Sequence, residues 1–359
     1  MVCYPINTYI DDGSWSRYFR VSCHFWIQRV LLPIVVIVGV IGNLVTIVVL
    51  TRKRMSCSTN TYLTALAVAD ILFLVFSLIL SFENYPNIRH LDYLPYWKYW
   101  RFGLWFTDAT SGVSIWLTVS FTLERYIAVC HPLKGRVMCT ESRARRVIVF
   151  VFILCPLLTI TTPFEWKIEV HSNSTASSIP SVLTCSTNLG KNEFYRNFFY
   201  WFSAMLFVFV PLVILAILNS FLISAVQQSK THRTNLTQVR SLYREKQENK
   251  MTMTLVAVVF LFLICQTPMA VTLIVKIFYD PKPNTLGDNM LGALGTIWNF
   301  LVAVNAASNF VMYCVMSDKY RRTLMLTFFP SFVYRHHQTG TVTSNTSFRL
   351  SSERRSPFS

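Results

Sequence analysis

The chain has 359 residues, of which 53% are hydrophobic and only 14% are charged. Soluble globular chains carry about a quarter charged residues, so this composition excludes an ordinary soluble enzyme. The 33 basic residues exceed the 17 acidic ones, but they lie between apolar blocks and do not indicate nucleic-acid binding. The nine cysteines form no C-x-x-C pair and have no histidines at zinc-binding spacing. No metal module and no organic cofactor is expected.

Seven apolar blocks are each long enough to cross the hydrocarbon core of a bilayer, which takes about 20 helical residues. They lie near residues 27–51, 60–83, 103–130, 147–165, 197–226, 251–278 and 290–316, and Pro156 interrupts the fourth. We therefore predict an all-α integral membrane protein that folds as a seven-transmembrane helix bundle, with a short cytoplasmic amphipathic helix after it.

Basic residues are enriched in the cytoplasmic loops of membrane proteins. With the N-terminus outside, the inner loops and tail hold 21 lysines and arginines and the outer segments hold 11. This predicts a multi-pass plasma-membrane protein with a cytoplasmic C-terminus. Its parts are an extracellular segment (1–26) without a cleaved signal peptide, the bundle (27–316), the amphipathic helix (317–330) and a disordered tail (331–359). The sequon at Asn173 is expected to be glycosylated.

Polar side chains inside a membrane span require a reason, because they are costly in hydrocarbon. Asp70 lies in the middle of the second span, and Ser114, Asn305 and Asn309 lie at depths that allow them to meet it. A carboxylate among neutral oxygens suits a hard cation such as Na⁺. The alternative is a hydrogen-bonded cluster that only packs helices.

Six motifs occur in order, each on its own span. They are Gly42-Asn43, Leu66-Ala67-x-Ala69-Asp70, Glu124-Arg125-Tyr126, Pro211, Phe262-x-x-Cys265-x-x-Pro268 and Asn309-x-x-x-Tyr313. In these motifs the sequence resembles a rhodopsin-like (class A) G-protein-coupled receptor over about residues 27–325. The resemblance implies activation of a heterotrimeric G protein. The sequence has no nucleophile–base constellation, phosphate-binding loop or zinc motif, so no catalytic activity is expected.

Three departures from the family pattern are informative about which members of the family the chain resembles. Phe310 replaces the proline of the seventh helix, Gln266 the switch tryptophan of the sixth, and Trp100 the disulfide cysteine of the third. Phe310 and the run Ser114–Val119 look like FMRFamide and myosuppressin receptors, while Arg125–Phe150 resembles thyrotropin-releasing-hormone receptors. The resemblance implies a receptor for an extracellular neuropeptide, with an amidated, FMRFamide-like peptide as one candidate. A receptor for a small non-peptide ligand is the alternative, and a transporter or channel is the rival from another class.

Amine receptors of the family have an aspartate where this chain has Thr107, and opsins have a lysine where it has Ala303. The outer half is acidic and aromatic, which suits a basic peptide, although interfacial aromatic belts give a similar pattern. The expected ligand-binding residues are Glu83, Thr107, Asp108, Ser111, Gln266, Met269, Trp298 and Asn299. For Asp108, a hydrogen bond to a neighbouring helix is the alternative role.

The resemblance also implies a cytoplasmic switch region. Its expected residues are Glu124, Arg125, Tyr126, Leu133, Glu248 and Tyr313. Arg125 is expected to pair with Glu248 in the resting state, unless Glu248 is simply solvated. The Ser/Thr-rich tail is expected to be a substrate for a receptor kinase and then to bind arrestin, and membrane lipid is a further partner.

Because Trp100 replaces the family's cysteine, Cys185 in the second outer loop lacks its usual partner. Two other cysteines lie on the outer side, Cys3 and Cys23. We expect a Cys23–Cys185 disulfide, because Cys23 is held near the bundle. Cys3–Cys185 and free thiols are the alternatives.

Overall fold

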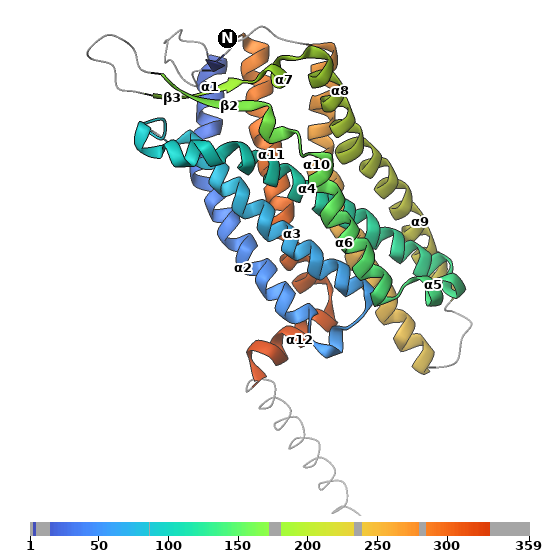
Figure 1. Cartoon of the computed structure of the whole chain (residues 1–359). Helices are drawn as coiled ribbons and strands as arrows, with labels where there is room; N and C mark the ends of the chain where they lie inside the picture. The colour runs from blue at the N-terminus through green and yellow to red at the C-terminus, as the bar shows by residue number, and fades with distance from the viewer. Residues whose placement is uncertain are drawn as a thin grey trace, which may run out of the picture.

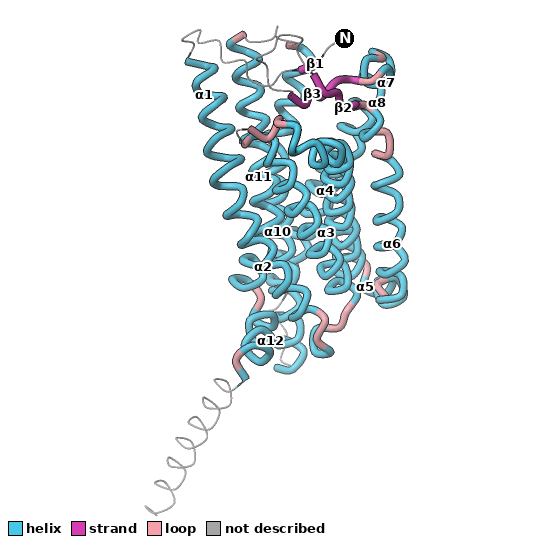
Figure 2. Tube along the Cα trace, turned by 60° about the vertical axis from the view of Figure 1, so that its left-hand side comes forward, coloured by secondary structure: helices cyan, strands magenta, loops and turns pink. Residues whose placement is uncertain are grey.

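A computed structural model of the chain describes residues 3–4, 15–85, 87–171, 181–232, 239–279 and 285–330. It shows a bundle of long helices with a small sheet at one end, called here the sheet end, and helix α12 at the other, the α12 end (Figure 1). Nearly all of the described residues are helical, as Figure 2 shows. The predicted all-α seven-helix bundle is confirmed.

The long helices follow one another in the predicted order. They are α1 (Trp15–His24), which continues through a π-helical turn (Phe25–Leu31) into α2 (Leu32–Leu50), α3 (Ser58–Ser81), α4 (Leu94–Cys130), α6 (Glu141–Leu158), α8 (Glu193–Ala204), which continues through a π-helical turn (Met205–Phe209) into α9 (Val210–His232), α10 (Val239–Phe278) and α11 (Leu286–Met316). Six of these spans are long and apolar enough to cross a membrane, and the apolar part of α10, Val256–Thr272, is shorter.

In the part of the chain that the structure describes, three short helices lie outside the spans, in addition to a few single turns. Helix α5 (Pro132–Met138) follows α4, and α7 (Asn188–Lys191) precedes α8. Helix α12 (Asp318–Phe328) lies within the range predicted for the amphipathic helix. It buries Tyr320, whose hydroxyl is 3.1 Å from that of Thr46, and this contact attaches α12 to α2.

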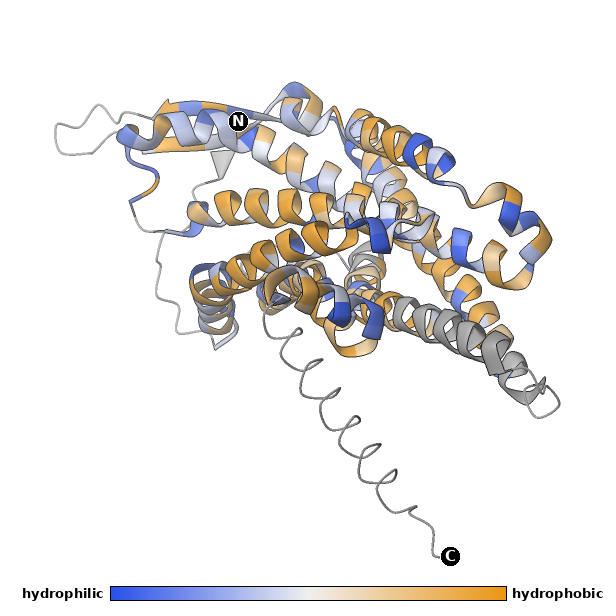
Figure 3. Cartoon of the chain, turned by 90° about the horizontal axis from the view of Figure 1, so that it is seen from below, coloured by the Kyte–Doolittle hydropathy of each residue, from blue (hydrophilic) through white to orange (hydrophobic). Residues whose placement is uncertain are grey.

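Apolar side chains cover both the inside and the outside of the bundle. The largest buried cluster joins α3, α4, α9 and α10 and includes Leu66, Leu117, Phe121, Leu215 and Phe262. Many other large apolar side chains are exposed on the outer faces of the helices, where the hydropathy colouring is mostly orange (Figure 3). Such an extensive apolar exterior is expected of helices that face lipid.

Proline explains where two spans change their helical pitch. Pro33 and Pro211 each closely follow one of the π-helical turns. A proline has no N–H, so the carbonyl four residues earlier loses its helical partner. For Pro33 this carbonyl belongs to Arg29, and it accepts a hydrogen bond from the Tyr85 hydroxyl at 3.4 Å. The extra residue in each turn therefore has a local cause.

The first helix begins earlier than the predicted span, at Trp15. Its turns at the sheet end pack on α11, where Arg20 forms an ion pair with Asp288 at 3.1 Å and Asn289 donates to Ser16 at 3.2 Å. Gly292 makes room for this arrangement, because a Cβ there would lie 2.8 Å from the Arg20 guanidinium. Much of the segment predicted as an extracellular N-terminus is thus helical and packed on the bundle.

The sheet has three antiparallel strands in the order β1-β3-β2. Strand β2 (Trp166–His171) pairs along its whole length with β3 (Ser181–Ser186), from Trp166 opposite Ser186 to His171 opposite Ser181. The two-residue strand β1 (Cys3–Tyr4) lies on the other side of β3. The sheet joins the start of the chain to the segment between α6 and α8.

Candidate functional site

A cavity of about 650 Å³ lies within the bundle toward the sheet end. Pockets that hold small ligands or parts of larger ones have volumes of about 300–1,000 Å³. Seven of the eight predicted ligand-binding residues line it: Glu83, Thr107, Asp108, Ser111, Gln266, Met269 and Asn299. The lining also includes residues that sequence reasoning missed, among them Gln28, Arg196, Tyr200 and Phe207.

Trp298 is not among the described residues that line the cavity. Its indole N–H donates to the Thr272 hydroxyl at 2.7 Å, which links α11 to α10. The next residue, Asn299, does line the cavity. The structure therefore gives Trp298 a contact between helices in place of the predicted ligand contact.

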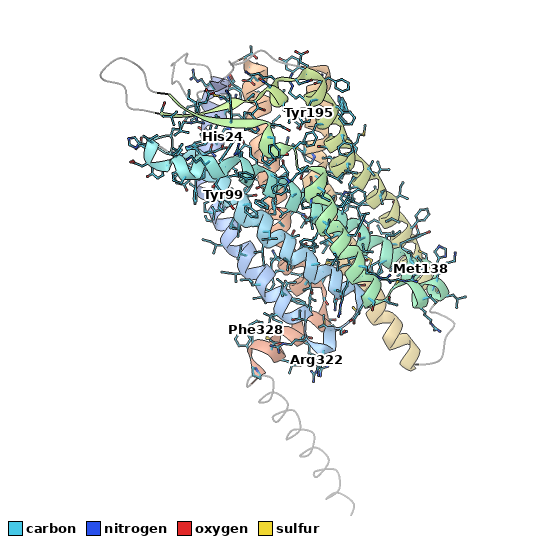
Figure 4. The ribbon with its side chains drawn as sticks, viewed as in Figure 1. His24, Tyr99, Met138, Tyr195, Arg322 and Phe328 are labelled. Carbon is cyan, nitrogen blue, oxygen red and sulfur yellow. The ribbon has the colours of Figure 1, made fainter. Side chains whose placement is uncertain are left out.

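The cavity has more acidic than basic groups. Asp108 is exposed to it, and no hydrogen bond from another described residue reaches the Asp108 carboxylate. Glu165 also lines it and accepts a hydrogen bond from the Tyr195 hydroxyl at 2.8 Å; Tyr195 lies at the sheet end (Figure 4). With Glu83 there are three carboxylates, against one guanidinium from Arg196.

Burial raises the pKa of Glu165 above its usual range, and the hydrogen bond from Tyr195 only partly opposes this shift. A raised pKa means that the negative charge of Glu165 is energetically unfavourable in the unliganded cavity. A cation brought in by a ligand would relieve this cost and lower the pKa again. The alternative role for Asp108, a hydrogen bond to a neighbouring helix, is not seen among the described residues.

An aromatic cluster surrounds Trp100, the residue in place of the family's helix-three cysteine. Its indole N–H donates to Glu83 at 2.8 Å, and its ring centroid lies 5.8 Å from those of Trp97 and Trp166. Arg89 stacks over Trp97, with 4.5 Å from its guanidinium carbon to the ring centroid. These contacts connect α4 with the end of α3 and with strand β2, without a covalent bond.

The predicted Cys23–Cys185 disulfide is wrong. Cys185 is disulfide-bonded, whereas Cys23 is a free thiol. Cys23 lies inside α1, which continues as one helix into α2, so it is held on the bundle and does not reach β3. The predicted glycosylation site, Asn173, lies outside the described residues.

In the middle of the bundle, the buried Asp70 carboxylate is shared by three helices. Ser114 donates to one of its oxygens and Asn309 to the other, both at 2.7 Å. Asn305 lies one helical turn before Asn309 on α11, and its buried side-chain oxygen has no hydrogen-bond partner among the described residues. Two of the three predicted partners of Asp70, Ser114 and Asn309, thus bond to it.

At the α12 end, one oxygen of the buried Glu124 carboxylate accepts three hydrogen bonds. They come from Ser58 at 2.7 Å, from Thr59 at 3.0 Å and from its neighbour Arg125 at 3.3 Å. Ser58 and Thr59 were not predicted to belong to this region. Hydroxyl residues at the start of the second span were the only signal in the sequence, and such residues are usually taken as helix caps.

The other predicted switch residues lie around the same end. The Tyr126 ring packs against Phe221, Tyr313 is buried, and Leu133 on α5 is 82% exposed. Figure 4 shows Met138 on α5 and Arg322 on α12 at this end of the molecule. The side chain of Glu248 lies outside the described residues, so its pair with Arg125 stays a prediction.

The seventh helix accommodates its unusual phenylalanine through a glycine on α2. A Cβ on Gly42 would lie 2.9 Å from the Cβ of Phe310, which is closer than side-chain carbons normally approach. Only glycine leaves room for this side chain at so short a distance between helices.

Residues 30–330 match the family described as serpentine type 7TM GPCR chemoreceptor Srw. The chain belongs to this family of seven-transmembrane G-protein-coupled receptors. It is therefore a multi-pass membrane protein of a receptor family, and the transporter or channel alternative is set aside.

Several proteins to which the chain is similar are named as peptide receptors. The chain is 28% identical to the FMRFamide receptor of Drosophila melanogaster over 315 residues, which are 85% of this chain and 54% of the relative. It is 25% identical to the Drosophila melanogaster sex peptide receptor over 334 residues (88% and 76%). The thyrotropin-releasing hormone receptor of Homo sapiens is 26% identical over 324 residues (84% and 78%). The chain thus spans only about half the length of the FMRFamide receptor.

The Trp100 cluster yields a prediction for stability. Trp100→Ala should lower the free energy of unfolding by about 3–5 kcal/mol, because it removes a buried ring and leaves a cavity. Trp100→Phe should cost less, about 1–3 kcal/mol, since it mainly leaves Glu83 without its donor. The measurement is thermal unfolding of the purified protein in lipid nanodiscs.

The matched control is Trp26→Ala, because Trp26 is 59% exposed. It should change the melting temperature little. Equal effects of Trp100→Ala and Trp26→Ala would show that the Trp100 cluster does not stabilise the sheet end of the cavity, which is called here the rim.

Proposed function

We propose that this chain is a plasma-membrane receptor for an extracellular peptide with a basic group, and that it activates heterotrimeric G proteins. The observation that carries the proposal is the cavity with three carboxylates, one of which, Asp108, has no hydrogen-bond donor among the described residues. The names of the relatives, which are receptors for FMRFamide, sex peptide and thyrotropin-releasing hormone, support a peptide ligand.

The sheet end is proposed to face the outside. Disulfides form and persist in oxidising compartments, and Cys185, which is disulfide-bonded, lies in the sheet. The excess of basic residues in the loops at the α12 end favours the same orientation. Peptide then enters the cavity from outside, and the α12 end, with its lysines and arginines, lies against anionic lipid and cytoplasm.

The size of the cavity limits how much of a peptide it holds. A volume of about 650 Å³ accommodates only a few residues, so the rest of a longer peptide would contact the sheet and the rim. A small non-peptide cation would also fit the cavity but would not need the rim. Loss of binding after changes in the sheet alone distinguishes the peptide from the small ligand.

Signalling is proposed to proceed by a population shift. A ligand that binds better to the conformation with an open α12 end increases the population of that conformation. In the resting state, Glu124 holds Arg125 through their ion pair at 3.3 Å. Opening would release Arg125 and, with the exposed Leu133, offer a surface to the G protein. A receptor kinase and arrestin are proposed to act on the Ser/Thr-rich tail, which lies outside the described residues.

The cluster around Asp70 is proposed to hold a sodium ion. The Asp70 carboxylate, the Ser114 hydroxyl and the unpaired Asn305 side-chain oxygen are the hard oxygen ligands that such a cation prefers, and Asn309 orients the carboxylate. The bound charge would offset the cost of the buried carboxylate. The packing role remains the alternative.

Asp108→Asn tests the ligand proposal. With FMRFamide as the first probe, the change should lower potency about 10- to 150-fold, because a charge-assisted contact contributes about 1.5–3 kcal/mol. The measurement is peptide-stimulated nucleotide exchange on G proteins in membranes from transfected cells. An analogue with citrulline in place of arginine keeps the shape without the charge, and Asp108→Asn should hardly change its potency.

Glu193→Gln is the matched control, because Glu193 lies at the start of α8 but is not among the described residues that line the cavity. It should behave as the unmutated chain. A panel of basic amidated peptides extends the test beyond FMRFamide. If no peptide stimulates exchange while small amines do, the peptide proposal is wrong.

Ser58→Ala tests whether the Glu124–Arg125 ion pair holds the receptor in its resting state; this ion pair is called the resting lock. The change removes one of three donors to the buried Glu124, which costs about 1–3 kcal/mol and weakens the hold on Arg125. Basal nucleotide exchange should rise several-fold at equal surface expression. Ser56→Ala is the control, since the Ser56 hydroxyl donates to the more exposed Glu141 at the same end. Equal basal rates in both variants would argue against the lock.

Asp70→Asn tests the sodium proposal. In the unmutated chain, Na⁺ should raise the melting temperature and lower peptide affinity, and both effects should disappear in the variant. Asp92→Asn, a change at an exposed acid of the sheet end, should keep both. Indifference of the unmutated protein to Na⁺ would leave only the packing role for the cluster.

A further inference from the structure

The first described residues of the chain pair with the middle of the sheet. In the register of β1 and β3, Cys3 lies opposite Cys185 and Tyr4 opposite Thr184. A strand of two residues gains too few hydrogen bonds to stay paired by itself. Something further must hold the start of the chain on β3.

The cysteine count identifies this restraint. The sequence has nine cysteines, of which seven in the described part of the chain are free thiols, and Cys185 is disulfide-bonded. Cys3 is the one that remains, and it is the residue opposite Cys185. We infer that Cys3 and Cys185 form a disulfide that anchors the N-terminus of the chain to the rim of the cavity.

The backbone geometry suits this bond. Directly opposed residues of an antiparallel pair have Cα atoms about 4.5–5.5 Å apart, and disulfides join cysteines whose Cα atoms are about 4.4–6.8 Å apart. The bond forms by exchange with a disulfide-bonded oxidant of the secretory pathway. The two thiols lose two protons and two electrons, and the oxidant takes them up to become a dithiol.

The bond lies close to the ligand cavity. Strand β2 pairs along the other edge of β3, where Cys185 lies opposite Lys167 and Ser186 lies opposite Trp166. The residue before Trp166 is Glu165, whose carbonyl accepts a hydrogen bond from Thr187 at 2.9 Å. A restraint on Cys185 therefore restrains the strand that begins next to the cavity carboxylate Glu165.

The inferred disulfide and the Trp100 cluster together hold the sheet in place, although Trp100 stands where the family has its helix-three disulfide cysteine. The Trp100 cluster connects β2 to α4 through packed rings. The disulfide connects β3 to β1 at the start of the chain, and α1 begins further along, at Trp15. The sheet is then attached at β2 to helix α4 and at β3 to the start of the chain.

Peptide mapping tests the bond directly. The full-length protein from the cell surface is denatured and alkylated with one reagent, then reduced and alkylated with a second. Cys23 should carry the first label, and Cys3 and Cys185 only the second. In Cys3→Ser, Cys185 should carry the first label. The inference is overturned if Cys3 of the unmutated protein takes the first label, or if Cys185 of Cys3→Ser still requires reduction.

Thermal unfolding in a mild reductant tests the consequence. Reduction should lower the melting temperature of the unmutated protein and of the control Cys23→Ser by the same few degrees. Cys3→Ser and the double variant Cys3→Ser, Cys185→Ser should already melt at the lower temperature and not respond to reductant. A Cys3→Ser protein that still loses stability on reduction would show that Cys185 has another partner.

Discussion

A carboxylate inside a lipid bilayer has no water to solvate it, so it must find hydrogen-bond donors within the protein. Asp70 meets this requirement with a donor from α4 and a donor from α11, each at 2.7 Å. Removal of either donor would leave a buried charge incompletely satisfied. The relative depth and rotation of three helices are therefore fixed at the centre of the bundle. Both the cavity toward the sheet end and the Glu124 site toward the α12 end depend on this alignment.

Two other carboxylates, the buried Glu124 and the cavity-exposed Asp108, differ in how their charge is compensated. Glu124 accepts three hydrogen bonds from α3 and α4, so its charge is compensated within the bundle. Asp108 is open to the cavity and has no such donor among the described residues. A compensated charge stabilises the conformation that surrounds it, whereas an uncompensated charge favours any partner that brings a cation. The same carboxylate chemistry thus stabilises helix packing at Glu124 and leaves an uncompensated charge in the cavity at Asp108.

The sequence predicts properties that depend on depth along a span. Runs of apolar residues gave the seven helices, and Asp70, Ser114 and Asn309 could be matched because their depths agree. Rotation about a helix axis is harder, because neighbouring residues point about 100° apart and the phase depends on packing against other helices. This is why Asn299 lines the cavity while Trp298 bonds to Thr272. The prediction of Cys23 as the partner of Cys185 was wrong because the pairing depends on the register of β1 with β3. A strand of two residues leaves no pattern in the sequence.

The rim of the cavity shows how a fold can keep its geometry after a residue that normally fixes it is exchanged. A cysteine at position 100 would restrain β3 through one bond. The tryptophan instead packs against β2, shares a cluster with Trp97, and donates to Glu83. Because Glu83 also lines the cavity, the hydrogen bond that stabilises the rim engages one of the cavity's three carboxylates. A ligand that draws Glu83 toward its own cation must then compete with Trp100, so rim packing and ligand charge are coupled through this one side chain.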